Sequence, residues 1–229
     1  MAKDDVFILS DHPDVTAVIF DMDGVLLDNE DAMMSASIQG LSDYGVTAEA
    51  SDFTQFFGRG TDAYVGGVCK MHGLEYRREI AEHIYDIYDK IAPAEARVFP
   101  GVSGVIAGLH AAGYKIAIAS SAAGRKVSTN IKVAGILPST VDCVVTEDDI
   151  TRNKPDPQIF LKAAEKLEVP IEKCIVCEDS FSGVRAAVAA GALCVGIRGT
   201  YSDEILKESG AACIIDGVSR LLLSKQQKL

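Results

Sequence analysis

Acidic side chains follow two of the apolar runs in the sequence. Asp21 and Asp23 come directly after one run, and Glu178 and Asp179 come directly after another. Several buried carboxylates are costly to bring together unless a cation compensates them. Oxygen ligands without histidine or cysteine suit Mg²⁺, which takes few protein ligands and keeps several waters. The sequence therefore predicts a Mg²⁺ site, to which Asp21 and Asp179 would contribute.

A lysine and two serine hydroxyl groups also lie at expected ends of strands or starts of helices, where they could bind an anion. Lys154 stands just before Pro155-Asp156-Pro157, at the expected start of a helix, and Ser120 and Ser121 follow a third apolar run. The chain has a net charge of −11, so it needs local positive charge to hold an anion. Mg²⁺ and Lys154 would concentrate that charge around a phosphoryl group, and Ser120 and backbone N–H groups would bind its oxygens.

The two aspartates after the first run are expected to have different catalytic roles. A carboxylate is a competent nucleophile toward a phosphoryl group and forms an aspartyl-phosphate. Asp21, at the strand end, is the candidate for this role. Asp23 lies in the following turn, from which it could reach the leaving oxygen. We therefore expect Asp23 to act as the general acid toward the departing alkoxide and then to activate water.

The elements that must position these residues alternate along the chain. Apolar runs typical of short buried strands occupy residues 15–20, 115–119, 143–146, 173–177, 194–197 and 212–215. Helical spacing occurs at residues 102–112, 124–134, 157–167, 181–190 and 202–209. This alternation predicts an α/β fold, a doubly wound parallel sheet covered on both faces. Ligands bind beyond the carboxyl ends of the strands in such a sheet, so the polar groups should meet in one crevice.

One segment breaks the alternation. Residues 29–97 show helical periodicity and no convincing strand. Pro93 and the turn at 99–101 mark the return to the core pattern. We therefore predict a core formed by residues 1–28 and 98–229, with an all-helical cap inserted at 29–97. Hinges near 27–29 and 97–101 would let the cap open and close over the crevice.

Four motifs in a fixed order point to a family. They are Phe20-Asp21-Met22-Asp23-Gly24-Val25, Ile118-Ala119-Ser120-Ser121, Lys154-Pro155-Asp156-Pro157 and Glu178-Asp179-Ser180. Each motif is weak alone, but the ordered set resembles the haloacid dehalogenase (HAD) superfamily over nearly the whole chain. The core would then be Rossmann-like, and the insertion resembles a C1-type cap. The chain is most similar to the β-phosphoglucomutase-like subgroup, which includes sugar-phosphate phosphatases as well as the mutase.

The resemblance implies roles for the motif residues. Asp21 would be the nucleophile, and Asp23 the acid/base, with its main-chain carbonyl also on Mg²⁺. Asp179 would bind the metal, and Glu178 would be either a ligand or a neighbour of the ligands. The phosphoryl oxygens would be contacted by Ser120 and Lys154.

Further comparison with the family limits the type of reaction that is expected. Asp23 argues for phosphoester chemistry, because true dehalogenases lack an acid there. Residues 29–44 contain no lysine, whereas phosphonate hydrolases carry a Schiff-base lysine in that helix. In the mutase, a histidine at the position of Met33 delays hydrolysis of the phospho-aspartate. We therefore expect a phosphatase acting on a small phosphomonoester, such as a sugar phosphate. A mutase, which is an isomerase, is the alternative.

Substrate-binding residues are also expected in and near the cap. Gly58 and Arg59 lie in a glycine-flanked turn that would present a guanidinium to an anionic or hydroxyl-rich part of the substrate. A solvated loop arginine is the alternative. Ser121 is a further candidate for substrate contact. Arg125 follows the second motif and could reach the substrate, although a surface position on a helix is the stronger interpretation.

Composition excludes several classes of function. With 33 acidic and 22 basic side chains, the chain would repel nucleic acid and anionic membranes. No apolar run approaches the ~20 residues needed to span a bilayer, and the polar start does not resemble a signal peptide. We expect a cytoplasmic protein, a monomer, with a small phosphorylated metabolite as its partner. Cys174 and Cys177 form a C-x-x-C that we interpret as buried packing.

Overall fold

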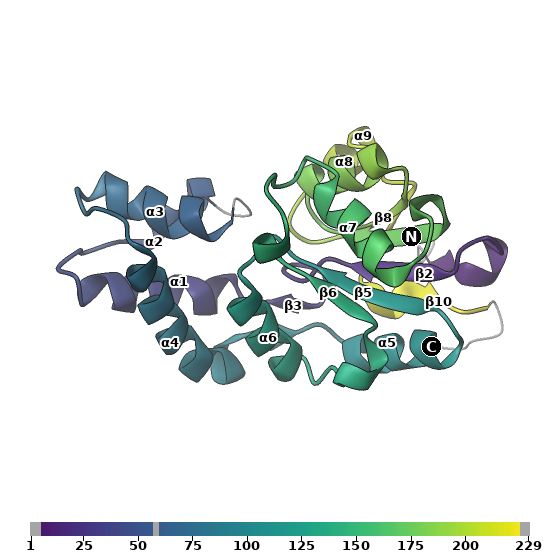
Figure 1. Cartoon of the computed structure of the whole chain (residues 1–229), viewed down its shortest axis with the longest axis horizontal. Coiled ribbons are helices and arrows are strands. Elements are labelled where there is room, and N and C mark those ends of the chain that lie inside the picture. Colours follow the sequence, from purple (N-terminus) through teal and green to yellow (C-terminus); the bar gives the residue numbers. More distant parts are fainter. Residues whose placement is uncertain (1–5, 57–59, 225–229) are drawn as a thin grey trace.

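A parallel sheet forms the centre of the larger part of the molecule (Figure 1). The computed structural model describes residues 6–56 and 60–224, and within them six strands make up this sheet. The strands are Ala17–Phe20 (β2), Lys115–Ala119 (β5), Cys143–Val145 (β6), Cys174–Glu178 (β7), Leu193–Ile197 (β8) and Cys213–Ile215 (β9). They are ordered β6-β5-β2-β7-β8-β9, and all neighbours are parallel. The predicted α/β fold is confirmed.

Helices cover both faces of the sheet. On one face lie Val102–Ala111 (α5) and Gly124–Val133 (α6), and on the other lie Gln158–Leu167 (α7), Phe181–Ala190 (α8) and Asp203–Glu208 (α9). Alternate residues of β2 serve the two layers. Val18 packs in the α5 layer, whereas Ile19 packs in the α7 and α8 layer. Burial on both faces explains why the strands are continuously apolar.

The inserted segment is helical and has a core of its own. Its helices are Glu30–Ser42 (α1), Ala50–Phe53 (α2), Thr61–Met71 (α3) and Arg78–Glu95 (α4), drawn on the left of Figure 1. Helices α1 and α4 pack along each other, with Leu41, Ile84 and Tyr88 among the buried side chains. The apolar stripe of α4 therefore stabilises the cap rather than the sheet.

Two short strands join the cap to the core. Leu27–Asp28 (β3) pairs antiparallel with Arg97–Val98 (β4), and an ion pair of 2.6 Å links Arg97 to Asp28. The two chain crossings thus run side by side, where the sequence places the hinges. The cap boundaries at 28/29 and 97/98 remain a proposal from the sequence, and this pair lies beside them. A two-residue strand is too short to show periodicity, and neither was predicted.

A second small pair was also missed. Phe7–Ile8 (β1) pairs in parallel with Leu221–Leu222 (β10). Elsewhere the predicted elements differ from the observed ones by a few residues at their ends. Cys174 and Cys177 pack in opposite layers, as expected for a buried structural pair. Across the described ranges, no helix combines the length and apolar character needed to cross a bilayer.

Candidate active site

The end of β2 places the first motif at the switch point of the sheet. The backbone N–H of Asp21 donates to the carbonyl of Cys177 at 3.0 Å, which continues the β2–β7 pairing. The chain then turns at Gly24, whose φ of +81° favours glycine. A Cβ at Gly24 would also overlap the Asp179 carboxylate. The glycine thus lets the turn approach the fourth motif closely.

Lys154 lies between two carboxylates. Its Nζ is 2.6 Å from Asp21 Oδ1 and 2.6 Å from Glu178 Oε1. The side chain is 5% exposed, and its ammonium lies over the ring of Phe160, 4.8 Å from the centroid. Short charge-assisted bonds of this kind are about twice as strong as neutral ones. Lys154 therefore brings the first and fourth motifs together.

Burial shifts the pKa values of the ionisable side chains in this cluster. It raises the pKa of Asp21 to about 7, although Lys154 acts in the opposite direction. Burial also raises the pKa of Asp179, and Glu178 and Asp21 raise it further. For Lys154, burial alone would lower the pKa, but the two carboxylates hold it above its usual value. The cluster contains three carboxylates and one ammonium, so it lacks positive charge.

The same cluster fits a metal ion. Asp21, Glu178 and Asp179 are all buried, and one oxygen of each lies within 4.8 Å of the others. An all-oxygen, all-carboxylate donor set suits a hard divalent cation. Bound positive charge would also compensate the excess of carboxylates. The described residues thus include a cluster that could hold a metal.

The two acids of the fourth motif have different surroundings. Glu178 Oε2 accepts hydrogen bonds from the backbone N–H of Ser180 at 2.8 Å and from its hydroxyl at 2.9 Å, while Oε1 meets Lys154. Asp179 accepts a hydrogen bond from the hydroxyl of Thr200. Ser180 also caps α8, as its hydroxyl accepts from Gly183 N. Asp179 is therefore not needed as the cap of that helix.

Three residues that the sequence interpretation missed hold the carboxyl of Asp23. Asn29 Nδ2 donates to Oδ1 at 2.7 Å, Asn130 Nδ2 donates to Oδ1 at 3.3 Å, and Lys126 Nζ lies 2.7 Å from Oδ2. Lys126 and Asn130 are one turn apart on α6, which begins just after the Ser120-Ser121 motif. Polar residues at this spacing on a helix beside a motif were a usable signal.

A cavity of about 150 Å³ lies above these groups. Seven of the predicted residues line it: Asp21, Asp23, Ser120, Ser121, Lys154, Glu178 and Asp179. The cap contributes Met33, Phe56, Tyr64 and Tyr85 to the lining, so cap and core form the walls of the space together. The structure thus brings these seven residues together around one cavity. Gly58 and Arg59 lie outside the described residues.

The two serines of the second motif differ in their hydrogen bonds. Ser120 is buried, and its Oγ accepts from Ala122 N at 3.2 Å. Within the described residues, the buried Oγ of Ser121 has no hydrogen-bond partner. A buried hydroxyl without a partner costs free energy, which an oxygen of a bound ligand would recover.

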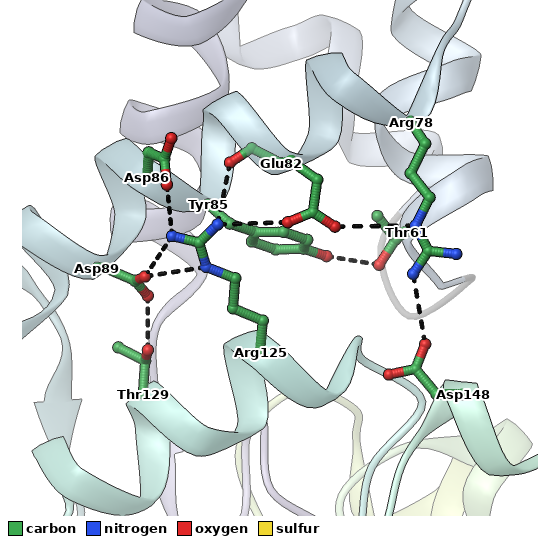
Figure 2. A network of polar contacts seen from close by, with 9 residues as sticks. All are labelled: Thr61, Arg78, Glu82, Tyr85, Asp86, Asp89, Arg125, Thr129 and Asp148. Carbon is green, nitrogen blue, oxygen red and sulfur yellow. Dashed lines mark hydrogen bonds and ion pairs between the residues drawn. The ribbon is translucent and has the colours of Figure 1, made fainter.

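Arg125 faces helix α4 of the cap (Figure 2), and the described residues that line the cavity do not include it. Its guanidinium contacts three acids of α4, at 2.7 Å from Asp89, 2.5 Å from Asp86 and 3.3 Å from Glu82. Thr129, one turn further along α6, donates to Asp89 at 2.5 Å. The weaker prediction that Arg125 reaches substrate is not supported, since its side chain is committed to this cap–core contact.

Comparison with known proteins defines the class. Residues 18–197 match the family described as Haloacid dehalogenase-like hydrolase, a span that includes all four motifs. The chain therefore belongs to the haloacid dehalogenase-like hydrolases, and the resemblance predicted from the motifs is confirmed. Its relatives and structural neighbours place it in the β-phosphoglucomutase-like subgroup.

Individual relatives add detail. The chain is 31% identical over 211 residues to a Thermotoga maritima protein named Phosphorylated carbohydrates phosphatase, covering 87% of this chain and 93% of the relative. It is 37% identical over 214 residues to Protein SUPPRESSOR OF QUENCHING 1, chloroplastic, of Arabidopsis thaliana, covering 92% of this chain but only 20% of that much longer protein. A crystal structure from Thermotoga maritima, provisionally assigned as a β-phosphoglucomutase, superposes with a TM-score of 0.72 at 27% identity, covering 90% and 97% of the two chains. The prediction of a hydrolase is confirmed by the family, and phosphatase names among the relatives agree with phosphomonoester hydrolysis.

Proposed function

We propose that this chain is a Mg²⁺-dependent phosphatase that hydrolyses a small phosphomonoester through an aspartyl-phosphate on Asp21. The observation that carries the proposal is the position of Asp21. Its carboxylate lies in the wall of a small cavity, 2.6 Å from the ammonium of Lys154 and within a cluster of three buried carboxylates. An anionic nucleophile can meet an anionic phosphoryl group only where positive charge is concentrated.

In the first step, a carboxylate oxygen of Asp21 forms a bond to phosphorus. The bond from phosphorus to the alcohol oxygen breaks, its electron pair stays on that oxygen, and Asp23 supplies the proton. In the second step, Asp23 takes a proton from water, whose oxygen attacks phosphorus and returns the bonding pair to Asp21. Ser120, Ser121 and Lys154 hold the phosphoryl oxygens through both steps.

Mg²⁺ would be held by Asp21 and Asp179, with the main-chain carbonyl of Asp23 and with Glu178 as a ligand or close neighbour. Bound there, it would supply positive charge against the repulsion between carboxylate and phosphate. The all-oxygen cluster and its excess of negative charge support this assignment.

The residue at position 33 supports hydrolysis over the mutase reaction. Met33 lines the cavity where the mutase is expected to carry a histidine. A thioether has no donor and is only a weak acceptor, so it cannot hold Asp23 away from water as an imidazole could. Water is therefore expected to reach the phospho-aspartate.

The size of the cavity supports a small substrate, a sugar phosphate or a similar metabolite. A space of about 150 Å³, lined by cap and core side chains, does not suit a macromolecule. The relative from Thermotoga maritima is named for phosphorylated carbohydrates, which agrees with this class. We further propose that the protein is a monomer and acts in the cytoplasm.

Phosphate release from a panel of phosphorylated metabolites, with Mg²⁺ and with a chelator, tests the proposal. We expect Mg²⁺-dependent release from one or more small phosphoesters, and none from an Asp21→Asn variant. β-Glucose 1-phosphate with a bisphosphate activator separates the two reactions, because a mutase would form glucose 6-phosphate. Faster turnover of phosphopeptides than of every small ester would contradict the assignment.

A further inference from the structure

Helix α6 carries two pairs of polar side chains spaced by four residues, and the pairs face different partners. Arg125 and Thr129 contact the acids of α4 (Figure 2). Lys126 and Asn130 contact the carboxyl of Asp23 instead. Residues four apart lie one above the other on a helix. One rigid element therefore meets both the cap and the expected acid/base residue.

The two carboxyl oxygens of Asp23 meet different numbers of donors. Oδ1 accepts from Asn29 at 2.7 Å and from Asn130 at 3.3 Å, whereas Oδ2 has Lys126 at 2.7 Å. A carboxylate oxygen has about two lone-pair sites. Among the contacts of the described residues, Oδ1 is thus filled and Oδ2 keeps one site open.

The surroundings of Lys126 and Asn130 favour their contacts with Asp23. The side chain of Lys126 is 11% exposed and lines the cavity, and within the described residues Asp23 is the only carboxylate at ion-pair distance from it. A buried ammonium is costly without such a partner. Asn130 is fully buried, and its Oδ1 accepts a 2.6 Å hydrogen bond from the hydroxyl of Tyr88. That bond orients the amide so that Nδ2 faces Asp23.

We propose that Lys126 and Asn130 are positioning residues that fix the Asp23 carboxyl so that Oδ2 exchanges the proton in both steps. This inference rests on the proposed phosphatase function. In the first step the alcohol oxygen, which keeps the electron pair of its broken bond to phosphorus, takes the proton from Oδ2. In the second step Oδ2 takes a proton from the attacking water, and Asp23 returns to its starting form.

A lysine in a phosphate-binding cavity has a simpler alternative role, which is contact with the phosphoryl oxygens. The leaving group separates the two roles. A sugar alkoxide must be protonated as it departs, whereas p-nitrophenolate is a stable anion that needs no proton. Loss of Asp23 positioning therefore lowers kcat/KM for an alkyl phosphate only. Loss of a phosphate contact lowers kcat/KM for both substrates.

The experiment compares Lys126→Met with the wild-type protein on p-nitrophenyl phosphate and on the alkyl phosphate that the panel shows to be hydrolysed fastest. General acid–base catalysis contributes about 10²–10⁴-fold, so we expect kcat/KM for the alkyl phosphate to fall by about tenfold or more. The value for p-nitrophenyl phosphate should stay close to wild type, which also shows that the site is folded. Lys126→Arg keeps the charge and should restore part of the loss. Lys132→Met, on the exposed side of the same helix, is the matched control and should leave both values unchanged.

Equal losses on the two substrates would overturn the proposal in favour of a phosphate contact or a structural role. Unchanged values on both would overturn it as well, while leaving the phosphatase function intact. A wild-type protein without activity on either substrate would instead remove the proposed function, and this inference with it.

Discussion

The ammonium of Lys154 lies 2.6 Å from a carboxylate oxygen of Asp21, although the two residues are 133 positions apart in the chain. Both side chains are buried, with exposures of 5% and 10%. A buried pair of this kind is a weak source of net stability, because desolvation of two charges offsets their attraction. The pair is better understood as an arrangement for chemistry, since it places positive charge beside the expected nucleophile.

Removal of this lysine should be costly. Lys154→Met leaves Asp21 and Glu178 buried without their shared cation, and breaking a buried pair in this way costs about 3–5 kcal/mol. We expect a loss of that size in the free energy of unfolding, measured by urea denaturation, together with loss of phosphatase activity. Lys162→Met removes a more exposed lysine of α7 and serves as the control. Equal stability of the two variants would contradict the buried pairing.

Metal binding should stabilise the protein in a pH-dependent way. The folded-state pKa of Asp21 is raised from 3.8 to about 7, so the metal-free protein binds this proton more tightly when folded than when unfolded. Its contribution to stability is therefore greatest below pH 4 and is lost as the pH rises toward 7. Mg²⁺ replaces the missing positive charge, so we expect a larger rise in Tm at pH 8 than at pH 5.

Asp179→Asn provides the matched variant for that measurement. It removes one of the three clustered carboxylates, so the metal-free protein should gain stability at pH 8. The response of its Tm to Mg²⁺ should be greatly reduced. A full response in this variant would show that the ion binds at a different place.

Substitution of glycine by alanine should change the free energy of unfolding in opposite directions at two helical positions. A Cβ at Gly183 would overlap the Glu178 carboxylate, whereas a Cβ at Gly108 has no neighbour within 4 Å among the described residues. Gly108→Ala should raise the free energy of unfolding by up to about 1 kcal/mol through helix propensity. Gly183→Ala should lower it by about 1–3 kcal/mol because the site is overpacked, and phosphatase activity should fall with it. The two free energies, measured by urea denaturation, test how closely α8 approaches Glu178.

The contact between Arg125 and the acids of α4 should depend on salt. The arginine side chain is 36% exposed, so each of its ion pairs contributes little, and we expect Arg125→Met to cost about 1 kcal/mol at low ionic strength. At 1 M salt the Debye length is about 3 Å, so the ion pairs are screened. The difference in stability between the variant and the wild-type protein should therefore become smaller. Thermal unfolding at 50 mM and at 1 M salt provides the measurement. A difference that is independent of salt would mean that packing, rather than charge, holds α4 against α6.

Much of the fold could be predicted because the decisive patterns are local. Strand β2 reads as a continuous apolar run because both of its faces are buried, and α7 and α8 carry clear helical spacing. The two-residue strands β3 and β4 could not be predicted, since each contains only a single two-residue period and shows no repeat. Their pairing depends on residues 69 and 71 positions apart that only the folded chain brings together.

The site was predictable where it depends on strand ends. Asp21, Ser120 and Asp179 follow strands of one parallel sheet, so their meeting follows from the topology. The contacts of Lys126 and Asn130 with Asp23 were not predicted, because they depend on the rotation of α6 about its axis. Their i, i+4 spacing beside the second motif indicates that the two side chains share one face of the helix, but not that this face lies toward Asp23.

A crystal structure of the protein with Mg²⁺ and beryllium trifluoride tests the central claim most directly. This mimic of a phosphoryl group binds to the carboxylate that accepts phosphate. The account predicts density for the mimic on a carboxylate oxygen of Asp21, with Asp179 on the metal ion and Lys154 within hydrogen-bond distance of a fluoride. A mimic attached to another side chain, or a metal ion bound away from Asp21 and Asp179, would contradict it.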